Sequence, residues 1–110
     1  MQKPGQPKPA PLEALSCLHL VAGAGSDAVA QCLSQADPAD DIMFVDAGVL
    51  HLPRLVAGSF DDSAGSLHFS AADLQAHGLF DAARRSNVDI LDDAGFCKLL
   101  AAHRHCLTWT

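Results

Sequence analysis

The chain has 110 residues, of which 49% are hydrophobic, a composition that suits one domain core and argues against a disordered chain. Its formal net charge of −6 argues against direct nucleic-acid binding by this chain alone and favours a basic protein partner. Four cysteines would suit two disulfides in a secreted protein, but residues 1–14 contain no apolar segment of a signal peptide. No apolar run approaches the roughly 20 residues of a membrane span, so we expect a cytoplasmic protein with reduced thiols.

The sequence divides into a tail and one predicted domain. Residues 1–14 are rich in Pro, Lys and Gln and are predicted to form a flexible tail, whereas residues 15–110 are predicted to fold. The domain opens with an apolar strand predicted over 15–21, followed by a turn at Gly23-Ala24-Gly25.

The first predicted helix covers residues 27–36, with Ser26 as its N-cap and Asp37-Pro38 as its stop. Its apolar residues fall at i, i+3, i+4 and i+7, the spacing of one helix face: Val29, Cys32, Leu33 and Ala36. We therefore place Cys32 on the apolar side of this helix.

The most diagnostic segment is the apolar strand predicted over 42–46, which ends in Asp46-Ala47-Gly48. A continuous apolar run indicates a strand buried on both faces, as in parallel sheets. Open α/β folds bind ligands at the carboxyl ends of such strands. Asp46 and Gly48 are therefore candidate binding residues, and capping the following turn is the alternative role for Asp46.

The remaining chain continues the alternation of strands and helices. A helical segment is predicted over 49–56, interrupted by Pro53, and is followed by a polar loop over 58–65 and a strand over 67–69. The next helix is opened by a Ser70–Asp73 capping box and ended by Gly78, and a link over 80–87 with a helical turn leads to a strand over 88–91. The last predicted helix is opened by Asp92 and Asp93 and is followed by an edge strand over 106–109; one face of this helix carries Phe96, Leu99, Leu100 and His103. This order predicts an α/β protein with a single Rossmann-like domain: a mainly parallel sheet of about five strands flanked by helices.

Two further site types can be weighed from the sequence. Gly23-Ala24-Gly25 lies between a strand and a helix, as phosphate-binding loops do, but it lacks the third glycine and the Gly-Lys-Ser/Thr of the known motifs, so a plain turn is favoured. A metal site is conceivable from five residues, namely Cys17, His19, His103, His105 and Cys106. Zinc sites usually use more closely spaced pairs, so we expect no metal and no other cofactor.

Cys32 is the candidate thiol. Free cysteine is among the most buried residue types, so an inert core thiol is the default interpretation. A reactive thiol needs a lowered pKa, from a helix N-terminus or a nearby cation. Cys32 lies more than one turn into its predicted helix, and no Lys, Arg or His is close to it in sequence. The residues alone therefore favour packing over reactivity.

Four segments in order resemble the DsrH/TusB-like family, small sulfur-relay proteins of the wider DsrE/DsrF/DsrH fold group. The segments are Leu18-His19, then Cys32-Leu33 with the strand from Asp41 through Asp46-Ala47-Gly48 to Val49, then Asp73-Leu74-Gln75-Ala76-His77-Gly78, and finally the block from Ile90 that carries Phe96, Leu99, His103 and Trp109. The resemblance covers about residues 17–109. This chain departs from the family pattern at Gly23-Ala24-Gly25, Ala47 and His77, and in its tail.

The resemblance implies a Rossmann-like fold and assembly with related DsrE/DsrF (TusD/TusC)-like subunits or with itself. It implies passage of persulfide sulfur between upstream and downstream sulfur-transfer proteins, toward tRNA wobble 2-thiouridine or within sulfur oxidation. Cys32 falls where DsrH-like members carry their thiol, which makes it the candidate persulfide carrier. On this reading the chain is a carrier or assembly subunit, not a stand-alone turnover enzyme.

Two other function classes remain open at this point. The chain could be a non-catalytic structural or interaction subunit of a DsrE-type oligomer, in which case Cys32 is dispensable for sulfur transfer. It could also be a small-ligand-binding α/β protein that uses the regions near Gly23 and Asp46.

Overall fold

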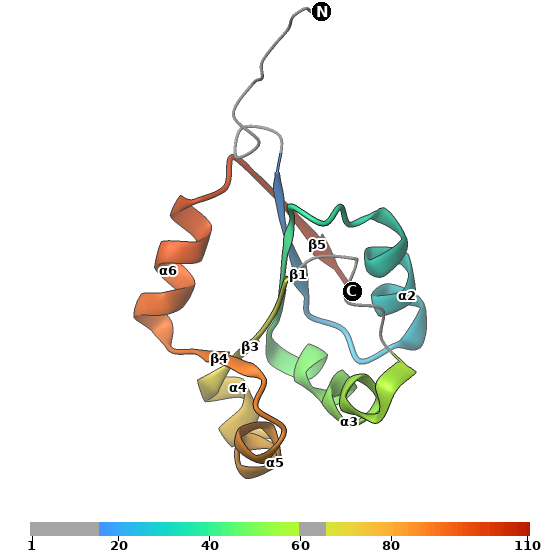
Figure 1. The fold of residues 1–110 in the computed structure, drawn as a ribbon, viewed down its shortest axis with the longest axis vertical. Coiled ribbons are helices and arrows are strands. Elements are labelled where there is room, and N and C mark those ends of the chain that lie inside the picture. The colour runs from blue at the N-terminus through green and yellow to red at the C-terminus, as the bar shows by residue number, and fades with distance from the viewer. Residues whose placement is uncertain (1–15, 60–65) are drawn as a thin grey trace, which may run out of the picture.

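A computed structural model describes residues 16–59 and 66–110 (Figure 1). Their centre is a five-stranded sheet in the order β4-β3-β2-β1-β5, and every strand pairing in it is parallel. The strands are β1 (Cys17–Val21), β2 (Asp41–Phe44), β3 (Ser66–Ser70), β4 (Asp89–Leu91) and β5 (His105–Trp109). The α/β fold with a parallel sheet predicted from the sequence is confirmed. The predicted tail over 1–14 and most of the predicted loop over 58–65 lie outside the described residues.

The strand order determines which face each helix covers. The chain steps from β1 to β2, β3 and β4 in one direction and then returns to place β5 beside β1. Because parallel crossovers are right-handed, the return step puts its helix on the opposite face. Figure 1 accordingly shows α2 (Ser26–Gln35) and α3 (Leu52–Arg54) on one side of the sheet and α6 (Asp93–Ala101) on the other.

The main core lies between the sheet and α2. Phe44 of β2 and Phe69 of β3 stack with ring centroids 4.8 Å apart, and both rings are buried with Val29 and Cys32 of α2. Met43, whose side chain alternates to the other face, is buried as well. The strand predicted over 42–46 is therefore buried on both faces as expected, although it begins at Asp41 and ends at Phe44.

Of the helix ends at Ser26, Ser70 and Gly78, two follow the predicted signals and one departs from them. Ser70 caps α4 (Ala71–Ala76), its Oγ accepting the Asp73 N–H at 3.3 Å. Gly78 has φ +72, and the Leu79 N–H bonds to the Leu74 carbonyl at 2.8 Å, the pattern of a Schellman stop. The prediction for Ser26 was wrong: it is the first residue of α2, and Gly25 occupies the N-cap without a side-chain hydrogen bond.

The segment predicted as a helix interrupted by Pro53 has a different structure. A 3-10 helix, η1 (Asp46–His51), leads into the single turn of α3 and then into a π-helical turn, η2 (Leu55–Ser59). Pro53 lies at the start of α3, where its missing N–H leaves no intrahelical bond unmade. It therefore begins a helical turn and does not interrupt one.

The last third of the chain contains α5 (Phe80–Arg85), β4, α6 and β5. Asp92 caps α6 by accepting the Gly95 N–H at 2.8 Å. No residue of α6 is fully buried, and His103 lies beyond the end of the helix. β5 pairs with β1 alone, so it is the edge strand that the sequence predicted.

Candidate functional site

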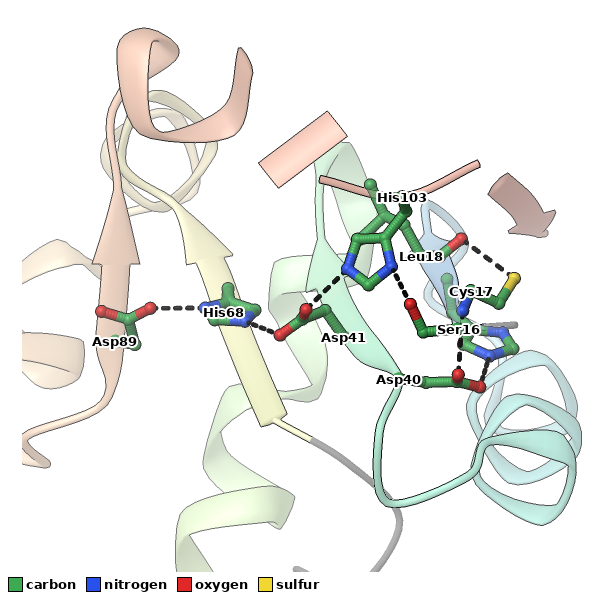
Figure 2. A network of polar contacts seen from close by, with 9 residues as sticks. Ser16, Cys17, Leu18, Asp40, Asp41, His68, Asp89 and His103 are labelled. Atoms are coloured by element: carbon green, nitrogen blue, oxygen red, sulfur yellow. Dashed lines mark hydrogen bonds and ion pairs between the residues drawn. The ribbon is translucent and has the colours of Figure 1, made fainter. Parts of the chain in front are cut away.

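Two polar networks start from adjacent carboxylates at the amino-terminal edge of the sheet. Asp40 immediately precedes β2 and Asp41 is its first residue, so their side chains turn toward opposite faces. Figure 2 shows Asp40 directed toward β1 and Asp41 lying between His68 and His103.

The Asp40 network is the buried one. The Asp40 Oδ2 atom lies 2.8 Å from His19 Nε2 and accepts the Asp37 N–H at 3.0 Å, while Oδ1 accepts the Cys17 N–H at 2.9 Å. Burial raises the pKa of Asp40, but the hydrogen bonds from His19, Asp37 and Cys17 outweigh it and leave the pKa below its ordinary value. The carboxylate is therefore held in its charged form.

The protonation of His19 follows from its two neighbours. Trp109 Nε1 can only donate, and it lies 3.1 Å from His19 Nδ1, so Nδ1 must accept. The ring proton is then on Nε2, which donates to Asp40. This chain of contacts runs from β5 through β1 to the start of β2 and fixes the edge strand to the centre of the sheet.

The Asp41 network crosses the other face. Its two oxygens lie 2.7 Å from His68 Nε2 and 2.7 Å from His103 Nε2, and His68 Nδ1 also contacts the carboxylate of Asp89. His103 Nδ1 lies 2.9 Å from the Ser16 hydroxyl. The network therefore links residues that lie within or just before each of the five strands (Figure 2).

Ser16, His103 and Asp41 have the connectivity of a hydrolase triad. A nucleophilic serine must be reached by its substrate, and Ser16 is only 5% exposed. The arrangement therefore suits a structural hydrogen-bond chain better than acyl transfer.

The structure does not bring the candidate metal ligands together in one site. His19 is bonded to Asp40 and Trp109, whereas His103 is bonded to Asp41 and Ser16 on the other face. Among residues 16–59 and 66–110, no group of three or more His, Cys, Asp or Glu side chains is arranged to hold a metal ion.

Cys32 lies inside the main core and is fully buried. Burial first, and then the charges of Cys17 and Asp40, raise its pKa to about 12. At neutral pH the side chain is therefore a thiol, and a thiol is a poor nucleophile. The expectation of a packed residue agrees with this geometry, whereas the carrier role stays a prediction.

The other three cysteines are all free of disulfides. Cys97 on α6 and Cys106 on β5 are exposed, and Cys17 on β1 is half-buried. Burial and the Asp40 charge raise the pKa of Cys17.

The carboxyl-terminal edge of the sheet carries the two other predicted site residues. Asp46 is exposed with φ +51, and its N–H donates to Asp73 Oδ2 at 2.8 Å. A Cβ on Gly48 would lie 1.8 Å from the Val21 carbonyl oxygen, so only glycine fits there. Gly48 thus has a packing role whether or not a ligand binds, and the binding role of both residues stays a prediction.

A cleft of about 320 Å³ lies beside these residues, between the strand ends and α6. Its lining includes the apolar residues Met43, Leu91 and Phe96 and the acidic residues Asp73, Asp92 and Asp93. Neither Asp46 nor Gly48 lines it.

Sequence reasoning missed Asp40, Asp41 and His68. A signal existed, since two adjacent acids directly before a buried strand cannot both point to solvent when the strand alternates between faces. The histidines that pair with them follow only from the strand register.

Residues 24–106 match the model of a family described as DsrH like protein. The matched region runs from the loop before α2 into β5. A comparison with curated proteins found no match. No helix among the described residues is both long enough and apolar enough to span a membrane.

Proposed function

Because the chain belongs to the DsrH-like family, whose members serve in sulfur relay, we propose that it is the partner-binding, non-catalytic subunit of a relay complex. The observation that supports this role is the state of Cys32. A carrier thiol must meet a donor persulfide, but Cys32 is fully buried and its pKa is raised to about 12. The chain's contribution to the relay would then be binding and placement of related subunits.

Partners would be DsrE/DsrF-like subunits, or further copies of this chain, together with the upstream and downstream sulfur-transfer proteins. The formal charge of −6 favours contact with basic protein surfaces over direct contact with RNA. Leu107, half exposed on the edge strand β5, and Leu100 on α6 are apolar residues that such contacts would cover. We place the complex in the cytoplasm.

A second candidate role is favoured by the position of Cys32 in its motif. In this second role, the Cys32 thiol would act as the sulfur carrier once assembly of the complex opens the core around α2. The Cys32 thiolate would attack the outer sulfur of a donor persulfide, leaving the donor as a thiolate and Cys32 as a persulfide. The persulfide would then pass its outer sulfur to an acceptor thiolate.

Thiol mapping separates the two roles. The complex with its companion subunits is incubated with a persulfide donor and analysed by mass spectrometry. The non-catalytic role predicts no adduct on Cys32, and it predicts sulfur transfer by Cys32→Ser at the wild-type rate. Cys97→Ser, on the exposed face of α6, is the matched control. A Cys32 adduct together with loss of transfer in Cys32→Ser would establish the carrier role instead.

The pathway is assigned by a separate measurement. Deletion of the gene and analysis of bulk tRNA would show loss of wobble 2-thiouridine if the relay serves tRNA thiolation. Unchanged 2-thiouridine with impaired growth on reduced sulfur compounds would place it in sulfur oxidation.

A further inference from the structure

A pocket of about 160 Å³ lies between α2 and α3, and neither Cys32 nor a member of the two aspartate networks is part of its lining. One part of its lining is polar, made by Ser26, His51 and Arg54. The rest is apolar and includes Val29 and Leu33 of α2. A pocket of this kind suits a small molecule with one polar end and one apolar end.

His51 is the unusual member of the lining, because it is only 3% exposed yet only partly satisfied. Its Nε2 lies 2.8 Å from the Gly23 carbonyl oxygen, which can only accept, so Nε2 carries the ring proton. The ring also meets Phe44 edge-on. Within the described residues, Nδ1 has no hydrogen-bond partner, and a buried polar atom in that state is unfavourable.

The surrounding charges indicate what Nδ1 would meet. Ser26 is the first residue of α2, a ten-residue helix whose N-cap, Gly25, supplies no side-chain hydrogen bond. The N–H groups of that first turn therefore add a partial positive charge near the Arg54 guanidinium. Asp27, the acidic residue of the same turn, is exposed and is not part of the lining.

We propose that this pocket binds a small carboxylate with a short apolar body. The carboxylate lies toward His51, Arg54 and the start of α2, and His51 takes up a proton at Nδ1 to donate to it. The apolar body packs against Val29 and Leu33. This site is independent of the sulfur-relay role, since it uses neither Cys32 nor the sheet edges.

The test uses the full chain labelled with ¹⁵N in its histidine rings, with butyrate as the probe. Butyrate is expected to move the His51 Nδ1 resonance from the unprotonated toward the protonated position and to bind at least about tenfold more tightly than butyramide. Sulfate, which has charge but no apolar body, is expected to bind at least about tenfold more weakly than butyrate.

Two variants complete the test. His51→Gln keeps an amide donor for the Gly23 carbonyl but removes Nδ1, and it is expected to lose most butyrate affinity. Arg54→Gln, at an exposed position, is expected to weaken butyrate binding severalfold without unfolding the chain. An unchanged Nδ1 resonance, equal binding of butyrate and butyramide, or equal binding of sulfate would each overturn the proposal.

Discussion

Asp40 and Asp41 are adjacent and chemically identical, yet they hold different parts of the molecule. Asp40 is 5% exposed and accepts two backbone N–H groups and one imidazole. Asp41 is 23% exposed, and its side-chain partners among residues 16–59 and 66–110 are imidazoles. Because Asp40 accepts backbone N–H groups, it fixes the course of the main chain, whereas Asp41 links side chains on a more solvent-exposed face. Burial and partner type, not residue identity, therefore decide how much each carboxylate contributes.

Truncating each carboxylate should give the largest difference. Asp40→Ala leaves two backbone donors and His19 buried without an acceptor, which we expect to cost about 3–5 kcal/mol of unfolding free energy. Asp41→Ala, at a partly solvated site, should cost about 1–2 kcal/mol. Urea denaturation measures both, and equal losses would contradict the comparison.

Trp109→Phe tests the outer end of the Asp40 network. It removes the Nε1–H that His19 Nδ1 accepts while keeping an aromatic ring, and should cost about 1–2 kcal/mol. In an Asp40→Asn background the cost should be smaller, because the His19 tautomer is then no longer fixed by a carboxylate. Additive losses in the double variant would show that the contacts are independent.

The pH dependence of stability should report the contribution of Asp40. Its folded pKa is lowered, so its stabilisation is present above the unfolded pKa of about 3.8 and is lost as pH falls through the lower folded pKa. The difference in unfolding free energy between wild-type protein and Asp40→Asn should therefore become smaller below about pH 4. A stability gap between the two proteins that stays constant from pH 6 to the acid limit would argue against this account.

Salt should have the smallest effect and should act on Asp41. Its pairs with His68 and His103 are partly exposed, so about 1 M NaCl should reduce the cost of Asp41→Asn by a few tenths of a kcal/mol. The cost of Asp40→Asn should change less, since Asp40 is buried. A larger salt effect on the cost of Asp40→Asn than on the cost of Asp41→Asn would contradict the distinction between a buried and a partly exposed carboxylate.

Local patterns in the sequence were enough for much of the fold. The continuous apolar run of β2, the Ser70 cap and the Gly78 stop each act over a few residues, and each prediction was confirmed. The prediction that Pro53 interrupts a helix was wrong, because a proline within a helical pattern can also occupy the first turn of a new helix.

The polar networks could not be predicted in the same way. His19 and Asp40 are 21 residues apart, and Trp109 and His19 are 90 apart, so their contacts depend on strand order and register. The close approach of Gly48 to the Val21 carbonyl depends on how η1 leaves the sheet. For Cys32, by contrast, helix spacing alone indicated the core position that the structure shows.

The place of β5 has a consequence for how the protein is made. This strand is the last of the described elements in chain order, yet it pairs with β1, the first of them, and places Val21 beside Trp109. During synthesis the first four strands emerge in the order in which they lie side by side, but the β1 edge that pairs with β5 stays unpaired until β5 has left the ribosome. Closing a loop this long also slows folding. A chain truncated or stalled before β5 would expose that edge of β1, and nascent-chain proteolysis should show protection of the domain only once β5 has emerged from the ribosome.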